Sequence, residues 1–258
     1  MLADLIKQDF PQVKLLKGDE YPDLVIILGG DGSILEAVQK YQPLGAKFMG
    51  LNLGTVGFLT AVRDYRHFSK AIKAAIAGKL KIQKRMLLHA EVMRKGKKIF
   101  SGVALNELLI QNLLGMVDLE ILQDGKLLLT CWGTGLLVAT PTGSTAYNLS
   151  AHGPILYPEL ECMIITKLLD HSIPIPSILV EADKQLTVKI KSFRKTDRLI
   201  LAEDNKTIDV IVSLDAQSNI SAEPGDSITL KKNKTPSEFL VYDDDNFLKS
   251  LREQFSIS

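Results

Sequence analysis

The sequence has little of what marks a secreted, membrane-bound or metal-caging protein. Its 258 residues include only two cysteines, Cys131 and Cys162, too few and too far apart for a disulfide framework or a cysteine-rich metal site. The N-terminus lacks the long apolar core of a signal peptide, and no apolar run approaches the ~20 residues that span a bilayer. We therefore expect a cytoplasmic protein that does not contact a membrane.

The sequence also lacks an excess of charge. Its 31 basic and 30 acidic residues give a net charge of +1, so no broad basic field is present and no nucleic-acid partner is expected. No pair of the four histidines has the spacing of metal ligands, and we expect no metal held by the protein alone. The apolar content of 46% is ordinary for a globular chain of one or two domains.

The first third of the chain alternates between helix and strand patterns. We predict helices at 2–10, 33–40 and 68–77, and strands at 23–28 and 47–53. Ser33 followed by Glu36 is a capping-box pattern, which places the start of the second helix at Ser33. The alternation predicts an α/β domain with a Rossmann-like parallel sheet over residues 1–79. The tail, 236–258, carries spaced apolar residues and is expected to pack back and complete this domain.

Beyond residue 80 the pattern changes to strands. We predict them at 87–93, 98–111, 117–122, 126–131, 186–190, 198–202, 207–214 and 227–232. Asp124-Gly125 is typical of a hairpin turn. One helix is predicted after Thr145, and residues 159–169 fit a helix or a strand equally well. A second, mainly β domain is therefore expected over residues 80–235.

A glycine-rich loop follows the first predicted strand, with the sequence Gly29-Gly30-Asp31-Gly32. Glycines let backbone N–H groups approach a phosphate closely, and the following helix adds its positive N-terminal end. Asp31 would lie at the carboxyl edge of the sheet, where a carboxylate could take a proton from an alcohol that attacks a phosphoryl group. A plain strand–turn–helix loop explains these four residues equally well.

Two other segments place polar residues next to apolar runs. Thr140–Asn148 (TPTGSTAYN) follows a strand pattern, and its hydroxyl and N–H groups could bind ribose or phosphate oxygens. An exposed turn with an N-cap is the alternative, although the length of the segment disfavours it. Asn106-Glu107 interrupts the apolar run VALNELLI, and such groups destabilise a strand unless they are paired or solvated. Strand alternation predicts opposite faces for the two, and a solvated edge alone would explain them.

These segments, with NLGTVGFL at 52–59 and SAHGPI at 150–155, resemble the NAD kinase family. GGDG alone is shared with diacylglycerol and sphingosine kinases, whereas TPTGSTAYN downstream of NE is far more specific. The resemblance implies an α/β domain and a β-sandwich-like domain, and transfer of a phosphoryl group from ATP or polyphosphate to the adenosine 2′-hydroxyl of NAD, making NADP. It also implies Mg²⁺ with ATP and a homo-oligomer, a dimer or tetramer. The alternatives are an NAD-binding protein with attenuated catalysis and a lipid kinase that shares GGDG.

The resemblance assigns a role to each motif residue. Asp31 is the catalytic base, and Gly29, Gly30 and Gly32 shape the phosphate loop. Glu107 binds ribose hydroxyls. The other implied contacts with the dinucleotide are made by Phe58 near the adenine, by Asn106, and by Thr142, Ser144, Thr145, Ala146 and Tyr147.

Four positions depart from the family pattern, among them Pro176, which falls where an arginine is frequent. Thr134 stands where the family has an aspartate that serves the nicotinamide side, so part of the NAD contact would be weakened. His152 replaces a usual glycine; its ring is the candidate that compensates for Thr134, and the alternative is that it only fills space beside the loop. Asp215-Ala216-Gln217 resembles a late Asp-Gly-Gln element without its glycine.

Overall fold

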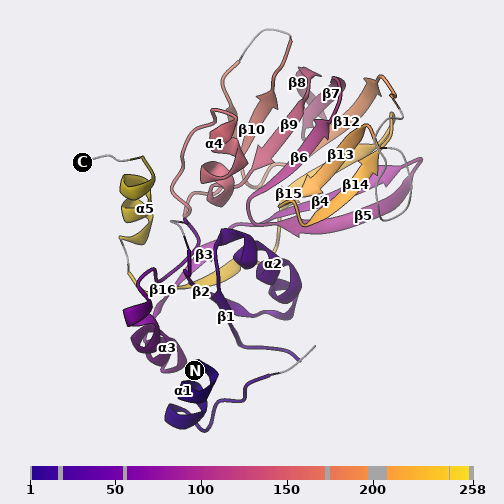
Figure 1. The fold of residues 1–258 in the computed structure, drawn as a ribbon. Helices are drawn as coiled ribbons and strands as arrows, with labels where there is room; N and C mark the ends of the chain where they lie inside the picture. The colour runs from indigo at the N-terminus through magenta and orange to yellow at the C-terminus, as the bar shows by residue number, and fades with distance from the viewer. Residues whose placement is uncertain are drawn as a thin grey trace. The chain divides into compact units, whose positions relative to one another are not determined.

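The computed structural model describes residues 2–16, 20–54, 57–171, 175–196, 208–243 and 245–255. Two compact units make up the chain: unit 1 is Met1–Lys84 with Ser237–Ser258, and unit 2 is Arg85–Pro236 (Figure 1). The predicted fold class is confirmed, because unit 1 is α/β and unit 2 consists mainly of antiparallel strands. Within these described ranges no helix is long and apolar enough to cross a membrane.

Unit 1 contains a four-stranded sheet in the order β1-β2-β16-β3. Its strands are β1 (Leu24–Leu28), β2 (Lys47–Leu51), β16 (Ser237–Val241) and β3 (Lys81–Arg85). β2 pairs in parallel with both β1 and β16, so the tail of the chain supplies a strand of the N-terminal sheet. The helices of this unit are α1 (Leu2–Asp9), α2 (Asp31–Tyr41), α3 (Phe68–Ile76) and α5 (Asn246–Phe255), with short 3-10 turns η1 (Gln42–Leu44) and η2 (Tyr65–His67).

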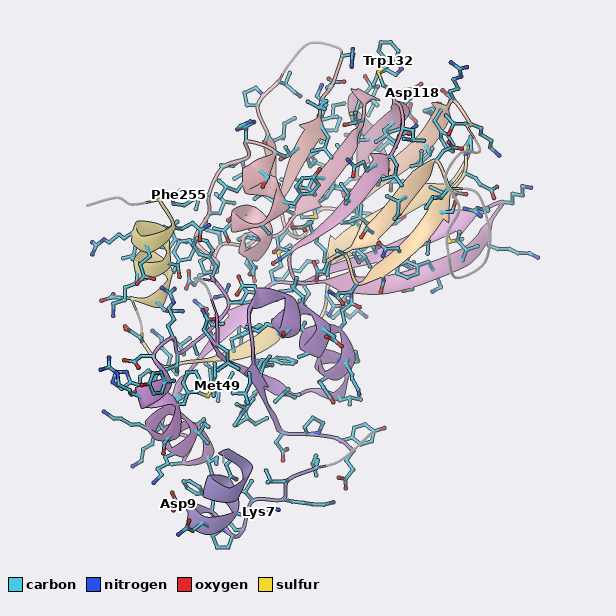
Figure 2. The ribbon with its side chains drawn as sticks, viewed as in Figure 1. Lys7, Asp9, Met49, Asp118, Trp132 and Phe255 are labelled. Atoms are coloured by element: carbon cyan, nitrogen blue, oxygen red, sulfur yellow. The ribbon has the colours of Figure 1, made fainter. Side chains whose placement is uncertain are left out.

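The core of unit 1 lies between the sheet and its helices. Met49 and Leu51 of β2 are fully buried, and Met49 lies inside the unit in Figure 2. α3 buries Phe68, Ala71, Ile72 and Ala75 against this sheet, the spacing of one helix face. Each large apolar side chain buried in this way contributes about 1.5–3 kcal/mol to folding. The core therefore fixes the strand ends from which the glycine-rich loop emerges.

The predicted capping box at Ser33 and Glu36 is wrong. α2 begins two residues earlier, at Asp31, with Gly30 as its N-cap and no side-chain cap. The Gly30 carbonyl accepts the N–H groups of Ser33 and Ile34, so the first turn is closed by backbone alone. The Ser33 hydroxyl instead fills the space beside Gly29, where an added Cβ would lie 2.6 Å from Oγ.

Unit 2 consists of two six-stranded sheets that share a large core, and a smaller buried cluster is formed by Leu137, Ala139, Ile164 and Leu168. One sheet has the order β11-β10-β9-β6-β13-β14, and the other β5-β4-β15-β12-β7-β8 (Figure 1). The bounds of the first sheet are β6 (Glu107–Asn112), β9 (Gly135–Ala139), β10 (Cys162–Leu168), β11 (Ile178–Glu181), β13 (Val210–Leu214) and β14 (Ser218–Ala222). Those of the second are β4 (Leu88–Arg94), β5 (Lys97–Ala104), β7 (Val117–Gln123), β8 (Lys126–Gly133), β12 (Leu186–Phe193) and β15 (Ser227–Lys232).

Three expectations for unit 2 need correction or completion. The single strand predicted over 98–111 is wrong, because the chain leaves one sheet after β5 and enters the other at β6. The ambiguous segment 159–169 contains a strand, β10. The helix after Thr145 is only one turn, α4 (Tyr147–Ser150), preceded by the 3-10 turn η3 (Thr142–Thr145). The strand predicted at 198–202 lies outside the described residues.

Candidate active site

The carboxylate of Asp31 is held in place by a neighbouring loop. Asp31 is half-buried at the first residue of α2, and it accepts the N–H groups of Phe58 at 2.9 Å and Leu59 at 3.1 Å. A carboxylate offers about four lone-pair sites, so these two bonds fix its direction and leave acceptor capacity for a further donor. Asp31 is thus a fixed carboxylate that can still accept a proton.

The glycines around Asp31 are of two kinds. A Cβ added to Gly57 would lie 2.3 Å from Asp31 Oδ1, so glycine there is required by packing within the protein. Gly30 and Gly32 are exposed, and an added Cβ would meet nothing within 4 Å at either position. Neither has a left-handed backbone. The chain itself therefore does not require glycine at these two sites, whereas the close approach of a phosphate to the backbone would require it.

Phe58 is a packed side chain in this structure. It is buried, and its ring centroid lies 5.9 Å from that of Phe247 in α5. The loop that holds Asp31 is thereby attached to the C-terminal helix.

The Asn106-Glu107 pair lies where the chain passes from one sheet of unit 2 to the other. Here three successive N–H groups point at one carboxylate: Asp215 accepts from Leu105 at 2.6 Å, Asn106 at 2.8 Å and Glu107 at 3.0 Å. The solvated-edge explanation does not hold, since Asn106 is buried and Glu107 half-buried. Asp215 therefore satisfies the backbone that the break between sheets exposes.

Two oxygen atoms of this segment have no hydrogen-bond partner among the residues that the structure describes. They are Asn106 Oδ1 and Glu107 Oε2, and both are shielded from solvent. Burial raises the pKa of Glu107 to about 8, and the negative charge of Asp215 adds to the rise. Burial also raises the pKa of Asp215 to about 6, although its three N–H donors oppose the rise. Adjacent buried atoms without partners are costly unless a ligand pairs with them.

The Thr140–Asn148 segment packs directly on this pair. A Cβ on Gly143 would lie 2.2 Å from the Asn106 carbonyl oxygen, so only glycine fits. The Thr140 hydroxyl donates to the Leu105 carbonyl at 2.6 Å and accepts the Gly143 N–H at 3.1 Å. The two motifs that are separate in sequence are therefore one structural element.

The predicted pocket residues of this segment differ in exposure. Thr142 and Ser144 are buried, Thr145 and Ala146 are half-buried, and Tyr147 is 37% exposed. Ser144 Oγ bonds both backbone groups of Leu156, which gives it a structural role.

The sequence did not assign two buried polar residues that organise this region. In the sequence, Asp215 belongs only to the late element that resembles Asp-Gly-Gln. Its position directly after an apolar strand is the signal that could have identified it. Asn148 Nδ2 donates to the carbonyls of Ser144 and Pro154, and its Oδ1 accepts the Thr166 hydroxyl at 2.8 Å.

Within unit 2, Thr134 and Thr140 lie at opposite ends of β9. Thr134 precedes β9 and Thr140 follows it, a separation of roughly 20 Å along an extended strand. The Thr134 hydroxyl donates to the Leu168 carbonyl at 3.1 Å, so it is already paired. His152 is exposed and has a left-handed backbone (φ 60°), as does Ala216 (φ 56°), which explains why glycine suits both positions. The expected compensation of Thr134 by His152 has no support in these contacts.

Among the described residues, the side chains of the candidate site do not form a cage for a metal ion. In the part of the chain that the structure describes, no three His, Cys, Asp or Glu side chains are grouped to hold one. Any divalent cation would need most of its ligands from a bound substrate and water.

Two family models match the chain. The ATP-NAD kinase N-terminal domain covers residues 13–80, and the ATP-NAD kinase C-terminal domain covers residues 105–242. Two solved structures share the fold at 23% identity. The yeast NADH kinase complexed with NADH has a TM-score of 0.79 and covers 92% of this chain and 67% of that one. An NAD kinase from Archaeoglobus fulgidus in complex with ATP has a TM-score of 0.76 and covers 100% of this chain and 94% of that one.

Curated relatives match over nearly the whole chain. The NAD kinase of Natranaerobius thermophilus is 32% identical over 256 residues, 98% of this chain and 85% of that protein. The NAD kinase of Geotalea daltonii is 31% identical over 241 residues, 92% of this chain and 80% of that protein. With both domain models matched and both motif regions in place, the chain belongs to the NAD kinase family.

Proposed function

We propose that this chain transfers the terminal phosphoryl group of ATP to the 2′-hydroxyl of the adenosine ribose of NAD, making NADP. The observation that carries the proposal is the fixed carboxylate of Asp31, next to two glycines that the chain itself does not require. The names of the relatives agree with this activity.

Asp31 acts as the general base. It takes the proton of the 2′-hydroxyl as that oxygen attacks the phosphorus, and the bond from phosphorus to the ADP oxygen breaks. Gly29, Gly30 and Gly32 let the phosphates approach the N-terminus of α2, whose positive end favours anions. Mg²⁺ bound to the phosphates of ATP would neutralise part of their charge.

Asn106 and Glu107 recognise the acceptor. Their buried, unpartnered oxygens would pair with ribose hydroxyls of NAD, and Asp215 keeps both residues in register. Because the Glu107 carboxyl holds its proton near neutral pH, it can donate one hydrogen bond as well as accept one. Phe58, Thr142, Thr145, Ala146 and Tyr147 belong to the proposed dinucleotide contacts by family resemblance.

A homo-oligomer, a dimer or tetramer in the cytoplasm, is part of the proposal. It is supported by apolar side chains around Thr134: Trp132 is 52% exposed, Leu169 77% and Leu113 42% (Trp132 is labelled in Figure 2). Analytical ultracentrifugation of the purified chain tests the oligomer.

The competing function is an NAD-binding protein with attenuated catalysis, which the departure at Thr134 motivates. An assay of NADP formation from NAD, ATP and Mg²⁺ separates the two. Parallel reactions replace ATP by polyphosphate, NAD by NADH, and NAD by diacylglycerol. Turnover with NAD supports the proposal. NAD binding without turnover favours the competing function, and phosphorylation of diacylglycerol alone would overturn both.

A further inference from the structure

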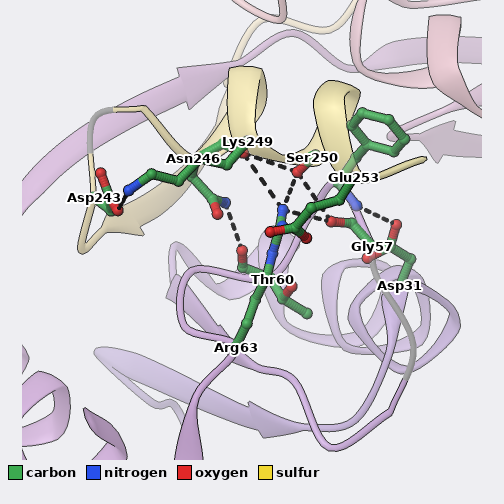
Figure 3. Close-up of polar contacts among 10 residues, drawn as sticks. Asp31, Gly57, Thr60, Arg63, Asp243, Asn246, Lys249, Ser250 and Glu253 are labelled. Atoms are coloured by element: carbon green, nitrogen blue, oxygen red, sulfur yellow. Dashed lines mark hydrogen bonds and ion pairs between the residues drawn. The ribbon is translucent and has the colours of Figure 1, made fainter. Parts of the chain in front are cut away.

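The C-terminal helix α5 contacts the loop that holds Asp31 (Figure 3). Arg63 Nη2 donates to the Gly57 carbonyl at 3.2 Å and also to the Ser250 hydroxyl. Ser250 Oγ lies 3.2 Å from the same carbonyl, and Arg63 Nη1 pairs with Glu253 at 2.5 Å. All of these residues belong to unit 1. One guanidinium therefore connects the loop to the helix.

These contacts act on the peptide group that donates to Asp31. The Gly57 carbonyl and the Phe58 N–H are the two ends of one planar unit, so a partner that fixes the carbonyl also fixes the direction of the N–H. That N–H donates to Asp31 Oδ2 at 2.9 Å. A cation on the carbonyl also polarises the peptide, which strengthens its N–H as a donor.

A second contact between α5 and the same loop lies three residues further along. Asn246 Nδ2 donates to the Thr60 carbonyl at 2.7 Å (Figure 3). Because Gly57 lies so close to Asp31 Oδ1, a shift of this loop must also shift the carboxylate.

We infer that α5, acting through Arg63 and Ser250, holds the carboxylate of Asp31 in the direction that proton transfer requires. Both are positioning residues, since they reach Asp31 through the Gly57–Phe58 peptide. The inference rests on the proposed role of Asp31 as the base. A role in stability alone is a weaker explanation of Arg63, because the desolvation of a largely buried guanidinium offsets its attraction to Glu253.

Steady-state kinetics of three variants test the inference. Arg63→Ala should lower kcat by about 10- to 100-fold, the effect of misplacing a reacting group by about 1 Å, and leave the KM values for NAD and ATP nearly unchanged. Ser250→Ala, a smaller change, should lower kcat in the same way but by less. Arg63→Lys should restore part of the loss, because a lysine keeps the charge but not the fork of donors. The matched control is Arg66→Ala, since Arg66 is an exposed arginine of the same segment that pairs with Asp64.

The deciding measurement is Arg63→Ala in an Asp31→Asn background. If Arg63 acts through Asp31, the second substitution lowers kcat no further. A multiplied loss, or a rise in KM equal to the fall in kcat, would overturn the inference. If Arg63→Ala does not fold, Ser250→Ala and Arg63→Lys replace it, and kcat of each is compared in the native and the Asp31→Asn backgrounds. Failure of the proposed function looks different, because the parent would then not turn over NAD with ATP. If only the role of Asp31 were wrong, Asp31→Asn alone would keep the parent's kcat.

Discussion

Each unit uses one carboxylate to collect backbone N–H groups, but the two carboxylates leave different atoms open. Asp31 is half-buried and accepts two N–H groups, and its own oxygens keep acceptor capacity for a further donor. Asp215 accepts three and is only 3% exposed, and the free acceptors lie on its neighbours, Asn106 and Glu107. The same device thus fixes a reacting group in unit 1 and a recognition segment in unit 2. The atoms left without partners indicate what meets the ligand.

The largest expected change in stability comes from replacing a glycine, and it should differ between Gly143 in unit 2 and Gly32 in unit 1. Gly143→Ala should destabilise the fold by about 3 kcal/mol or more, because its Cβ overlaps a backbone oxygen that cannot move away. Gly32→Ala has open space within α2 and should stabilise the fold by up to about 1 kcal/mol. The same variant should raise the KM for ATP. Urea unfolding and steady-state kinetics of both variants provide the check; a stable Gly143→Ala or a fully active Gly32→Ala contradicts the contrast.

Removing the charge of Asp215 should have the next largest effect. Asp215→Asn should cost about 3 kcal/mol of stability and weaken NAD binding, since an amide cannot accept all three N–H groups. Asp124→Asn is the matched control. Like Asp215, Asp124 lies in a hairpin turn and has a left-handed backbone conformation, but it is exposed and accepts a single N–H. Chemical denaturation and calorimetric NAD titration measure both effects. Equal losses of stability and NAD affinity in the two variants would show that Asp215 does not hold the Asn106-Glu107 segment in place.

Glu107→Gln should stabilise the fold in a pH-dependent way. The Glu107 pKa rises from 4.5 to about 8 on folding, so the folded chain keeps a proton that the unfolded chain releases. The free energy of unfolding of the parent should therefore fall as pH rises from about 4.5 to 8, and the variant should lack this part of the fall. Melting temperatures at pH 5 and pH 8 should diverge in favour of the variant. If the melting temperatures of the parent and the variant change in parallel with pH, Glu107 is not buried as described.

The smallest effects are expected at the departures from the family pattern. His152→Gly should stabilise the fold by up to about 1 kcal/mol, because it removes a left-handed non-glycine residue. Thr134→Asp and His152→Gly should change NAD affinity independently, since the two residues share no hydrogen-bond partner among the residues that the structure describes. NAD titrations of the parent, both single variants and the double variant check this. A gain from Thr134→Asp that appears only with His152→Gly would restore compensation.

Local pattern predicted most elements of the fold, because alternating apolar runs specify strands whatever sheet they join. It failed where the outcome depends on distant partners. β16 is a short strand whose place is set by pairing with β2, and the strand predicted over 98–111 breaks because Asp215, more than a hundred residues away, satisfies its backbone. The Ser33 capping box failed because the backbone of Gly30 closes the turn first.

The motif residues of the candidate site could be predicted from the sequence. The residues that position them could not. Asp31, Asn106 and Glu107 stand out as polar residues in glycine-rich or apolar runs. Arg63 and Ser250 carry no such signal, since the sequence alone predicts a solvent-exposed arginine in a loop and a solvent-exposed serine in a helix, whereas Ser250 is fully buried and Arg63 largely so. Only their contacts with the Gly57 carbonyl reveal them.

The central claim, that Asp31 is the base of NAD phosphorylation, is tested most directly by the single-turnover rate of Asp31→Asn with NAD and ATP both saturating. Calorimetric affinities for the two nucleotides and the melting temperature are measured on the same sample. We expect the rate to fall by roughly two to four orders of magnitude, with affinities and stability close to those of the parent. A rate near that of the parent, with both nucleotides bound, would contradict the account.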